Sequence, residues 1–126
     1  MSVEVIMSDA APAPGGSYAH AVVHGELIVT AGQVGIDPAT GAVPADVSAQ
    51  TKQALANIAA VLAEAGAGLG DVMKTTCFLA DLADFAEFDA AYREAFGDHR
   101  PARSTVGVAL APAYSVEIEA VAVRAG

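Results

Sequence analysis

The pattern of apolar and polar residues in the first third of the chain predicts a loop, then two short β-strands, then a turn-rich segment. Residues 3–7 alternate and are followed by a segment rich in proline and glycine, which predicts a loop. The stretch 18–30 is rich in β-forming residues and has Gly25 near its middle, which predicts two strands joined by a tight turn. Residues 32–41 contain many turn-forming residues, so the chain is expected to change direction there.

Apolar residues at helical spacing predict two helices. Asp46 is placed to cap the first, and Gly66 lies where its apolar stripe ends. The second helix is expected to begin at Asp84, which has the spacing of a capping box with Glu87, and to end at Gly97. One side of this helix carries aromatic residues that are expected in the core: Phe85, Phe88, Tyr92 and Phe96.

Three further strands are predicted over residues 71–81, 102–110 and 115–124, the last two joined as a hairpin around Ala111. The element order ββαβαββ predicts an α+β fold in one domain, residues 1–126, with both helices on one face of the sheet. The other face would then need a cover. If it is apolar, packing against neighbouring subunits in a closed ring would provide one.

Arg103 stands out because it lies inside a predicted strand of a chain with only six Lys and Arg. In a hairpin centred on Ala111, Arg103 would face Glu119 and Thr105 would face Glu117, all on one sheet face. Such a group is either a structural ion pair or a site in which Arg103 binds a substrate carboxylate while a nearby Glu moves protons. Spacing alone favours the structural ion pair.

Composition narrows the function classes. The chain has 126 residues, of which 54% are hydrophobic and 17% charged, which is typical of one globular domain. A domain of this size leaves much apolar surface exposed, so self-association is expected. The net charge of −9 disfavours nucleic acid and anionic membrane surfaces as partners. The single cysteine, and the lack of a signal-peptide pattern or a long apolar run, predict a soluble cytoplasmic protein.

Several familiar kinds of site are not supported by the sequence. His20, His24 and His99 lack the spacing of metal ligands, so no metal site is predicted. The glycines of residues 66–70 match neither a phosphate-binding loop nor a dinucleotide fingerprint. Cys77 is interpreted as a packing residue.

Short segments in a fixed order carry a family resemblance. The most specific is PARSTV at residues 101–106, followed by VEIEAVAV at 116–123. Earlier segments include APAPGGSY at 11–18, TAGQVG at 30–35 and DPATG at 37–41. In this order and spacing, over nearly the whole chain, they resemble the RidA (YjgF) family of enamine and imine deaminases.

The resemblance implies a chorismate-mutase-like α+β fold, a homotrimer and active sites in clefts between subunits. It implies hydrolysis of reactive 2-enamino and 2-imino acids, such as 2-aminoacrylate, to 2-keto acids and ammonia without a metal or organic cofactor. By position, Arg103 would anchor the substrate carboxylate, Glu117 would hold the attacking water and move protons, and Tyr18 would form a wall of the cleft. Gly32 and Thr105 would contribute main-chain groups.

The chain also departs from the family pattern. Ala31 stands where a serine is usual, which removes a hydroxyl from the substrate-binding set, and Asp89 replaces a common asparagine. Thr105 replaces a common cysteine, and His20 brings a titratable ring into the loop that carries Tyr18. Two alternatives therefore stay open: a non-catalytic or regulatory protein that binds 2-keto acids, and a pathway-specific enzyme for a larger imine. An RNA-cleaving role fits poorly with the negative charge.

Overall fold

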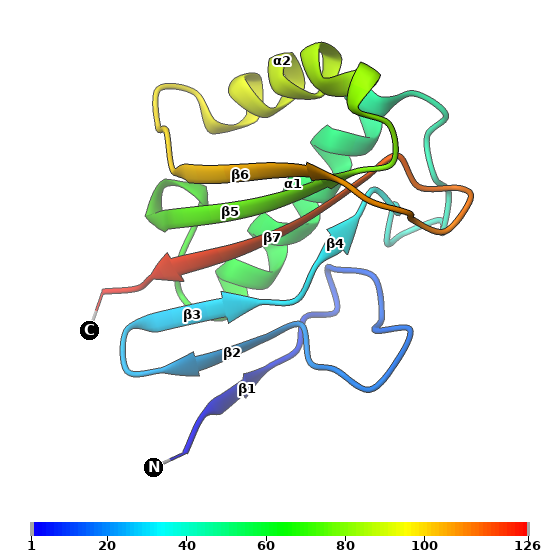
Figure 1. The fold of residues 1–126 in the computed structure, drawn as a ribbon. Helices are drawn as coiled ribbons and strands as arrows, with labels where there is room; N and C mark the ends of the chain where they lie inside the picture. The colour runs from blue at the N-terminus through cyan, green and yellow to red at the C-terminus, as the bar shows by residue number, and fades with distance from the viewer. Residues whose placement is uncertain (1, 126) are drawn as a thin grey trace.

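The alternating segments form one mixed sheet that carries both helices on a single face (Figure 1). The structure is a computed structural model and describes residues 2–125. The strands are β1 (Glu4–Ile6), β2 (Ala21–His24), β3 (Leu27–Thr30), β4 (Gln33–Val34), β5 (Val72–Leu79), β6 (Ala102–Gly107) and β7 (Val116–Val123). The helices are α1 (Val47–Glu64) and α2 (Phe85–Phe96). Two 3-10 turns complete the elements: η1 (Leu69–Asp71) directly precedes β5, and η2 (Leu82–Asp84) directly precedes α2. The predicted α+β class, with both helices on one face, is confirmed.

The sheet order is β1-β2-β3-β7-β5-β6, with β4 also paired to β7. The predicted β6–β7 hairpin is wrong, because β5 lies between these strands: it is parallel to β6 and antiparallel to β7. The crossover through α2 returns the chain to the free edge of β5, as strand–helix–strand units do. The connection to β7 then passes around the end of β5, where the Val108 amide donates to Leu79 and the Ala80 amide donates to Ser115.

Local signals at the turn and at the first helix are confirmed. Gly25 has a φ of +62° at the turn between β2 and β3, a conformation that glycine adopts without strain. Asp46 caps α1 by accepting a 2.7 Å hydrogen bond from the amide of Ala49. Glycine follows each helix, Gly66 shortly after α1 and Gly97 directly after α2. The short strands β1 and β4 are absent from the predicted order, because loop- and turn-forming residues adjoin both in the sequence.

The predicted capping box of α2 is wrong. The Asp84 side chain makes no capping hydrogen bond. The chain instead begins to coil three residues earlier, where Asp81 accepts a 2.9 Å hydrogen bond from Ala83 and starts the turn η2. Since η2 leads directly into α2, the helix does not need a second cap at Asp84.

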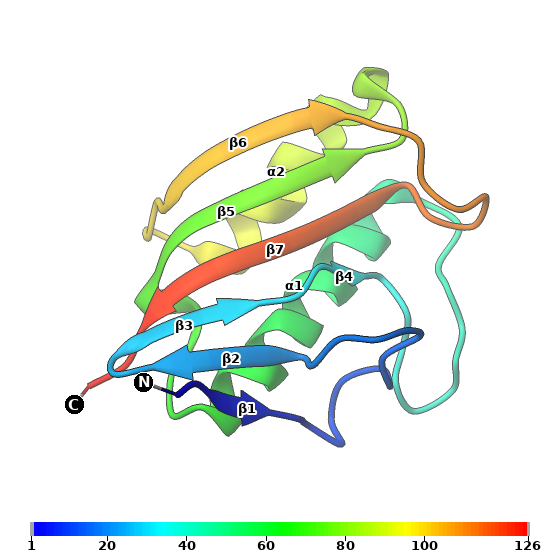
Figure 2. The ribbon, with the colours of Figure 1, turned by 60° about the horizontal axis from the view of Figure 1, so that its bottom comes forward.

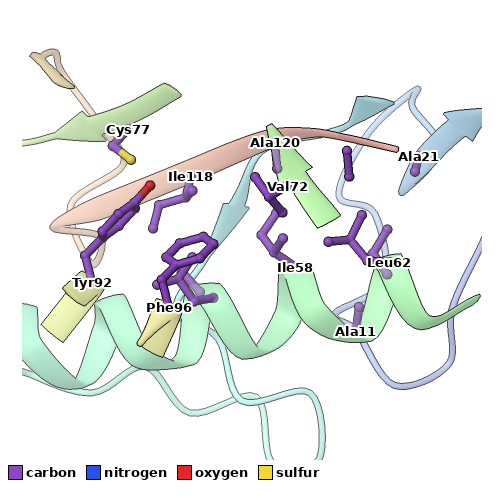
Figure 3. Packing of buried hydrophobic residues seen from close by; sticks show 14 of the residues in the cluster. Ala11, Ala21, Ile58, Leu62, Val72, Cys77, Tyr92, Phe96, Ile118 and Ala120 are labelled. Atoms are coloured by element: carbon purple, nitrogen blue, oxygen red, sulfur yellow. The ribbon is translucent and has the colours of Figure 1, made fainter. Parts of the chain in front are cut away.

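The core lies between the helices and the sheet (Figure 3). Ile58 and Leu62 of α1 pack toward Val72 and Ile118 of the sheet, and all four are almost fully buried. Cys77 is also buried, and this burial raises the pKa of its thiol to about 11, which confirms its interpretation as a packing residue. Three aromatic side chains of α2 are buried as expected, whereas Phe85 is 40% exposed.

The face of the sheet opposite the helices, which is turned toward the viewer in Figure 2, carries exposed apolar side chains. Val5, Leu27, Val29 and Val106 are between 42% and 62% exposed there. Their partners on the neighbouring strands face the same side of the sheet. Along each strand, these positions alternate with the positions that face the helices. This open face has the apolar character that packing against another subunit requires. In residues 2–125, neither helix has both the length and the apolar character needed to cross a membrane.

Candidate active site

Arg103 projects from β6 toward α2 and is held on several sides. Its Nη1 donates a 2.8 Å hydrogen bond to Oδ1 of Asp89, and its side chain is only 22% exposed. The guanidinium carbon lies 4.7 Å from the ring centre of Tyr92 and 5.4 Å from that of Phe88. The Tyr92 hydroxyl is itself fixed by a 2.7 Å hydrogen bond with Thr75. The guanidinium is therefore positioned before any ligand arrives.

A cavity of about 330 Å³ opens beside this guanidinium. It lies between α2 and the start of β6 and is lined by Asp89, Tyr92, Arg93, Arg100, Pro101 and Arg103. Asp89 accepts a second hydrogen bond, 3.2 Å long, from Arg93. Three cations against one carboxylate make this cavity suited to an anion. Sequence reasoning missed Arg93 and Arg100, although each lies within ten residues of Arg103 and Arg93 follows Asp89 at helical spacing.

Glu117 projects from β7 onto the open face of the sheet. It lines two small cavities, of about 240 and 290 Å³, that also share Tyr18 and Gly32. Ala31 lines the second of them and Tyr114, which sequence reasoning missed, lines the first. Burial raises the pKa of Glu117 above its ordinary value, and the nearby Glu119 carboxylate adds to this effect. A carboxylate with a raised pKa is well suited to accept a proton.

His20 fixes the loop that carries Tyr18. It is 1% exposed, and its Nδ1 accepts a 3.0 Å hydrogen bond from the amide of Ser8. Nδ1 can accept only if the proton is on Nε2, which lies 2.7 Å from the carbonyl of Pro12 and donates to it. Tyr18 is 49% exposed, and its hydroxyl accepts a 3.1 Å hydrogen bond from Gly15. His20 is thus a satisfied core residue that holds the wall of the Glu117 cavities in place.

The two groups of predicted site residues lie on opposite faces of the sheet. Arg103 is opposite Thr75, which bonds α2, whereas Glu117 is opposite Phe78 on the other face. The prediction that Arg103, Thr105, Glu117 and Glu119 share one face is therefore wrong for a single chain, because it depended on the hairpin that β5 interrupts. The structure joins Arg103 with Asp89, and joins Glu117 with Tyr18, Ala31 and Gly32.

Comparison with known proteins identifies the family. The family described as Endoribonuclease L-PSP matches residues 8–124. A 2-iminobutanoate/2-iminopropanoate deaminase of Escherichia coli K12 is 46% identical over 96% of this chain and 98% of its own. The chain belongs to the RidA (YjgF) family. Among solved structures, the YjgF gene product of E. coli is 46% identical with a TM-score of 0.92, over 97% of this chain and 99% of that one.

Other RidA-family relatives are similar over the same length. A RutC family protein of Pyrococcus abyssi is 46% identical over 98% of this chain and 99% of its own. The structure of E. coli TdcF with bound serine is 40% identical with a TM-score of 0.91, over 97% of this chain and 99% of that one. The resemblance found in the sequence is thus confirmed, and RidA-family chains share the sheet and helices described here.

Thr105 is on the same face of β6 as Arg103 but outside both groups of predicted site residues. It is opposite Cys77 on the helix side of β6, and its hydroxyl is buried without a hydrogen-bond partner among the described residues. It lines neither the Arg103 cavity nor the Glu117 cavities. Across residues 2–125, no three His, Cys, Asp or Glu side chains gather as they would around a metal ion.

Replacing His20 with alanine is expected to destabilise the fold by about 2–4 kcal/mol, because the buried Ser8 amide and the Pro12 carbonyl lose their partners. Urea denaturation measures the stability, and limited proteolysis within residues 8–18 reports release of the loop. His24→Ala is the control, since His24 is exposed and contacts only the carbonyl of Ser2, at 3.3 Å. Equal denaturation midpoints for the two variants would contradict this role.

Replacing Gly32 with alanine is expected to lower activity about 10- to 100-fold while the fold persists. A Cβ at this position would collide with Oε2 of Glu117 and lie 2.9 Å from its Cδ. The flexible Glu117 carboxylate can move aside, so the fold tolerates the change, but the carboxylate no longer has the position that the reaction needs. Steady-state kinetics and circular dichroism measure the two effects. Gly68→Ala is the control, because a Cβ there meets nothing within 4 Å.

Proposed function

We propose that this chain hydrolyses 2-imino acids, and 2-enamino acids such as 2-aminoacrylate after their tautomerisation, to 2-keto acids and ammonia. Its relatives named 2-iminobutanoate/2-iminopropanoate deaminase support this activity, since they are 46% identical over 96% of the chain. Two side chains carry the proposal. The guanidinium of Arg103 is fixed beside a cavity suited to an anion, and Glu117 is a carboxylate with a raised pKa beside two smaller cavities.

The complete site is expected to form between protomers. Arg103 and Glu117 face opposite sides of one sheet, so neither can reach a substrate held by the other within the chain. Arg103 lies on the edge strand β6, and the exposed apolar residues of the open face offer a surface for a neighbour. In a homotrimer, Arg103 of one protomer would meet Glu117 and Tyr18 of the next, and each contact would recur around the ring.

The reaction requires only positioning and proton transfer. Arg103 binds the substrate carboxylate through parallel hydrogen bonds, which sets the C=N carbon near a water held by Glu117. Glu117 accepts a proton from that water as the water oxygen bonds to the imine carbon, and it passes this proton to the imine nitrogen, which gives a neutral carbinolamine. The carbinol hydroxyl then gives up its proton, which Glu117 transfers to the same nitrogen. The C–N bond breaks as the C=O bond forms, ammonia leaves with the 2-keto acid as the second product, and Glu117 is again a carboxylate.

The remaining predicted residues have supporting roles in this proposal. Tyr18 forms a wall of the cleft, and Gly32 leaves room for the Glu117 carboxylate because a side chain there would collide with it. Thr105 would contribute a main-chain group from the edge strand. Ala31 supplies no hydroxyl, so substrate binding depends more heavily on Arg103 than in relatives that have a serine there.

The proposal is tested by following the decay of 2-iminobutanoate and 2-aminoacrylate, generated in the cuvette by an amino-acid oxidase or a pyridoxal-phosphate lyase. The protein is expected to accelerate the decay and the appearance of 2-keto acid in proportion to its concentration. Decay rates that stay unchanged across several such imines would overturn the deaminase proposal.

The pH dependence of this activity offers a separate prediction. Activity should fall at acidic pH as Glu117 takes up a proton, and the fall should begin above the ordinary pKa of a glutamate because the pKa of Glu117 is raised. Glu119→Gln removes the smaller cause of that rise and should move the acidic limb to lower pH. Burial, the larger cause, remains. A pH–rate profile of kcat/KM for both proteins checks the direction.

A second candidate is a protein that binds 2-keto acids without turnover. Ala31 lacks the hydroxyl of relatives, and Asp89 already occupies one nitrogen of Arg103. Calorimetric binding of 2-oxobutanoate together with no effect on imine decay would favour this candidate. An enzyme for a larger, pathway-specific imine would show turnover only with that substrate. The RNA-cleaving role named in the family description fits poorly with a net charge of −9.

A further inference from the structure

The chain concentrates its few cations around one cavity. Arg93, Arg100 and Arg103 are three of its six Lys and Arg, and all three line the cavity of about 330 Å³ beside α2. Asp89 is the single carboxylate among the lining residues, so the lining carries three positive charges and one negative charge. This local excess of cations occurs in a chain whose net charge is −9. An anion approaching elsewhere on the molecule meets a repulsive field, whereas this cavity attracts it.

The structural contacts of these arginines leave donors available. Arg103 uses Nη1 for Asp89, and Arg93 uses Nη2 for the same carboxylate. Arg100 uses Nη1 for the carbonyls of Gly97 and His99 at the end of α2. A guanidinium has five N–H donors in a planar fork. Asp89 therefore offsets part of the charge of two arginines, while Arg100 has no ion pair among the described residues.

One carboxylate anchor does not require three arginines. Arg103 is the most enclosed of them and is fixed by aromatic rings, which suits a single, defined contact with the 2-carboxylate. Arg93 and Arg100 are exposed and lie at the cavity wall, where they can contact a group further along the substrate. The cavity volume is at the lower end of the roughly 300–1,000 Å³ of small-molecule sites, enough for a short chain with two acidic ends.

We propose that Arg93 and Arg100 bind a second carboxylate of the substrate, so that the chain prefers the imines of dicarboxylic amino acids over imines with uncharged side chains. This inference rests on the proposed function, in which Arg103 binds the 2-carboxylate. The planar fork of arginine matches a carboxylate in two parallel hydrogen bonds. Asp89 has a part in this selectivity, because it orients two of the three arginines.

Kinetics of matched substrates test the preference. Imines of glutamate and of 2-aminobutanoate are generated by oxidases, and the ratio of their kcat/KM values is compared between proteins. The wild type should favour the dicarboxylic imine, and Arg100→Gln should lower the ratio about tenfold. Arg93→Gln should lower it in the same direction. Lys52→Gln is the control: it removes the same charge, but Lys52 pairs with Glu94 outside the cavity, at 3.4 Å, and the ratio should hold.

Binding of stable keto acids separates this inference from the proposed function. Calorimetry should show that 2-oxoglutarate binds more tightly than 2-oxobutanoate, and that Arg100→Gln removes the difference. The second-carboxylate site would be overturned if the wild type bound the two keto acids with equal affinity, or if Arg100→Gln lowered kcat/KM equally for both imines. Imine hydrolysis itself would still stand in either case. If no imine decays faster with the protein, the proposed function fails, and the calorimetric comparison still decides what the cavity binds.

Discussion

Replacing Arg103 with alanine is expected to reduce imine hydrolysis about 100-fold or more, since two charge-assisted hydrogen bonds to the substrate carboxylate are lost. Without them the C=N carbon is no longer held near the water on Glu117. Activity should not be recovered by raising the pH, because the loss is one of positioning. The fold should persist, since Asp89 keeps its contact with Arg93 and the four aromatic rings of α2 stay packed on one another.

Two further variants make this result specific. Arg103→Lys keeps the charge but loses the planar fork, so its activity should lie between those of the wild type and Arg103→Ala. Arg124→Ala is the matched control: the Arg124 side chain is 27% exposed, close to the 22% of Arg103, and pairs with Glu4 away from the Arg103 cavity and the two Glu117 cavities. Comparable activity losses in Arg103→Ala and Arg124→Ala would show a general effect on stability, and the anchor role would fail.

Elements set by local interactions could be predicted from the sequence. The turn at Gly25, the cap at Asp46 and the ends of both helices follow from residues only a few positions apart, and the structure confirms them. The local rule failed at Asp84, because the chain has a second acidic residue, Asp81, that starts the coil one turn earlier. Both aspartates are residue types that cap helices, so residue type alone does not choose between them.

Strand order could not be predicted from spacing. Residues 102–124 have the pattern of a hairpin, yet β5 lies between β6 and β7 and is hydrogen-bonded to both. That choice depends on the crossover through α2, which brings distant parts of the chain together. The same error placed Arg103 beside Glu119. In one chain these two residues lie on opposite faces of the sheet, so the predicted group of side chains does not form there.

The residues of the candidate site were found to different degrees. Arg103 stands out in the sequence as a cation inside a predicted strand, and the family resemblance over PARSTV and VEIEAVAV supplies the roles of Arg103 and Glu117. The role of His20 as a clamp could not be predicted, because its partners are main-chain groups of Ser8 and Pro12, which carry no sequence signal. The cavity lined by the three arginines could not be predicted from the sequence either, since Arg93 and Arg100 come close to Arg103 only through the packing of α2 beside β6.

Mixing two inactive variants is expected to restore activity if each site draws on two protomers. Arg103→Ala chains lack the anchor and Glu117→Gln chains lack the base, so each alone should be inactive. In a trimer that contains both kinds of chain, one site in three combines an intact Arg103 with an intact Glu117, so purification through two tags should give about one third of the wild-type activity. Co-expression with two affinity tags, purification through both, and the imine-decay assay measure this recovery.

A matched mixture shows why the recovery would be informative. Co-expressing Arg103→Ala with a chain that carries both substitutions gives assemblies of the same size and similar charge, but no intact Arg103 is present to complete a site. This mixture should stay inactive. If the first mixture also stays inactive, the two residues do not meet across an interface, because recovery requires an anchor on one chain and a base on another. The opposite faces of Arg103 and Glu117 lead to the expectation of recovery, since a site within one chain would have to pass through the sheet.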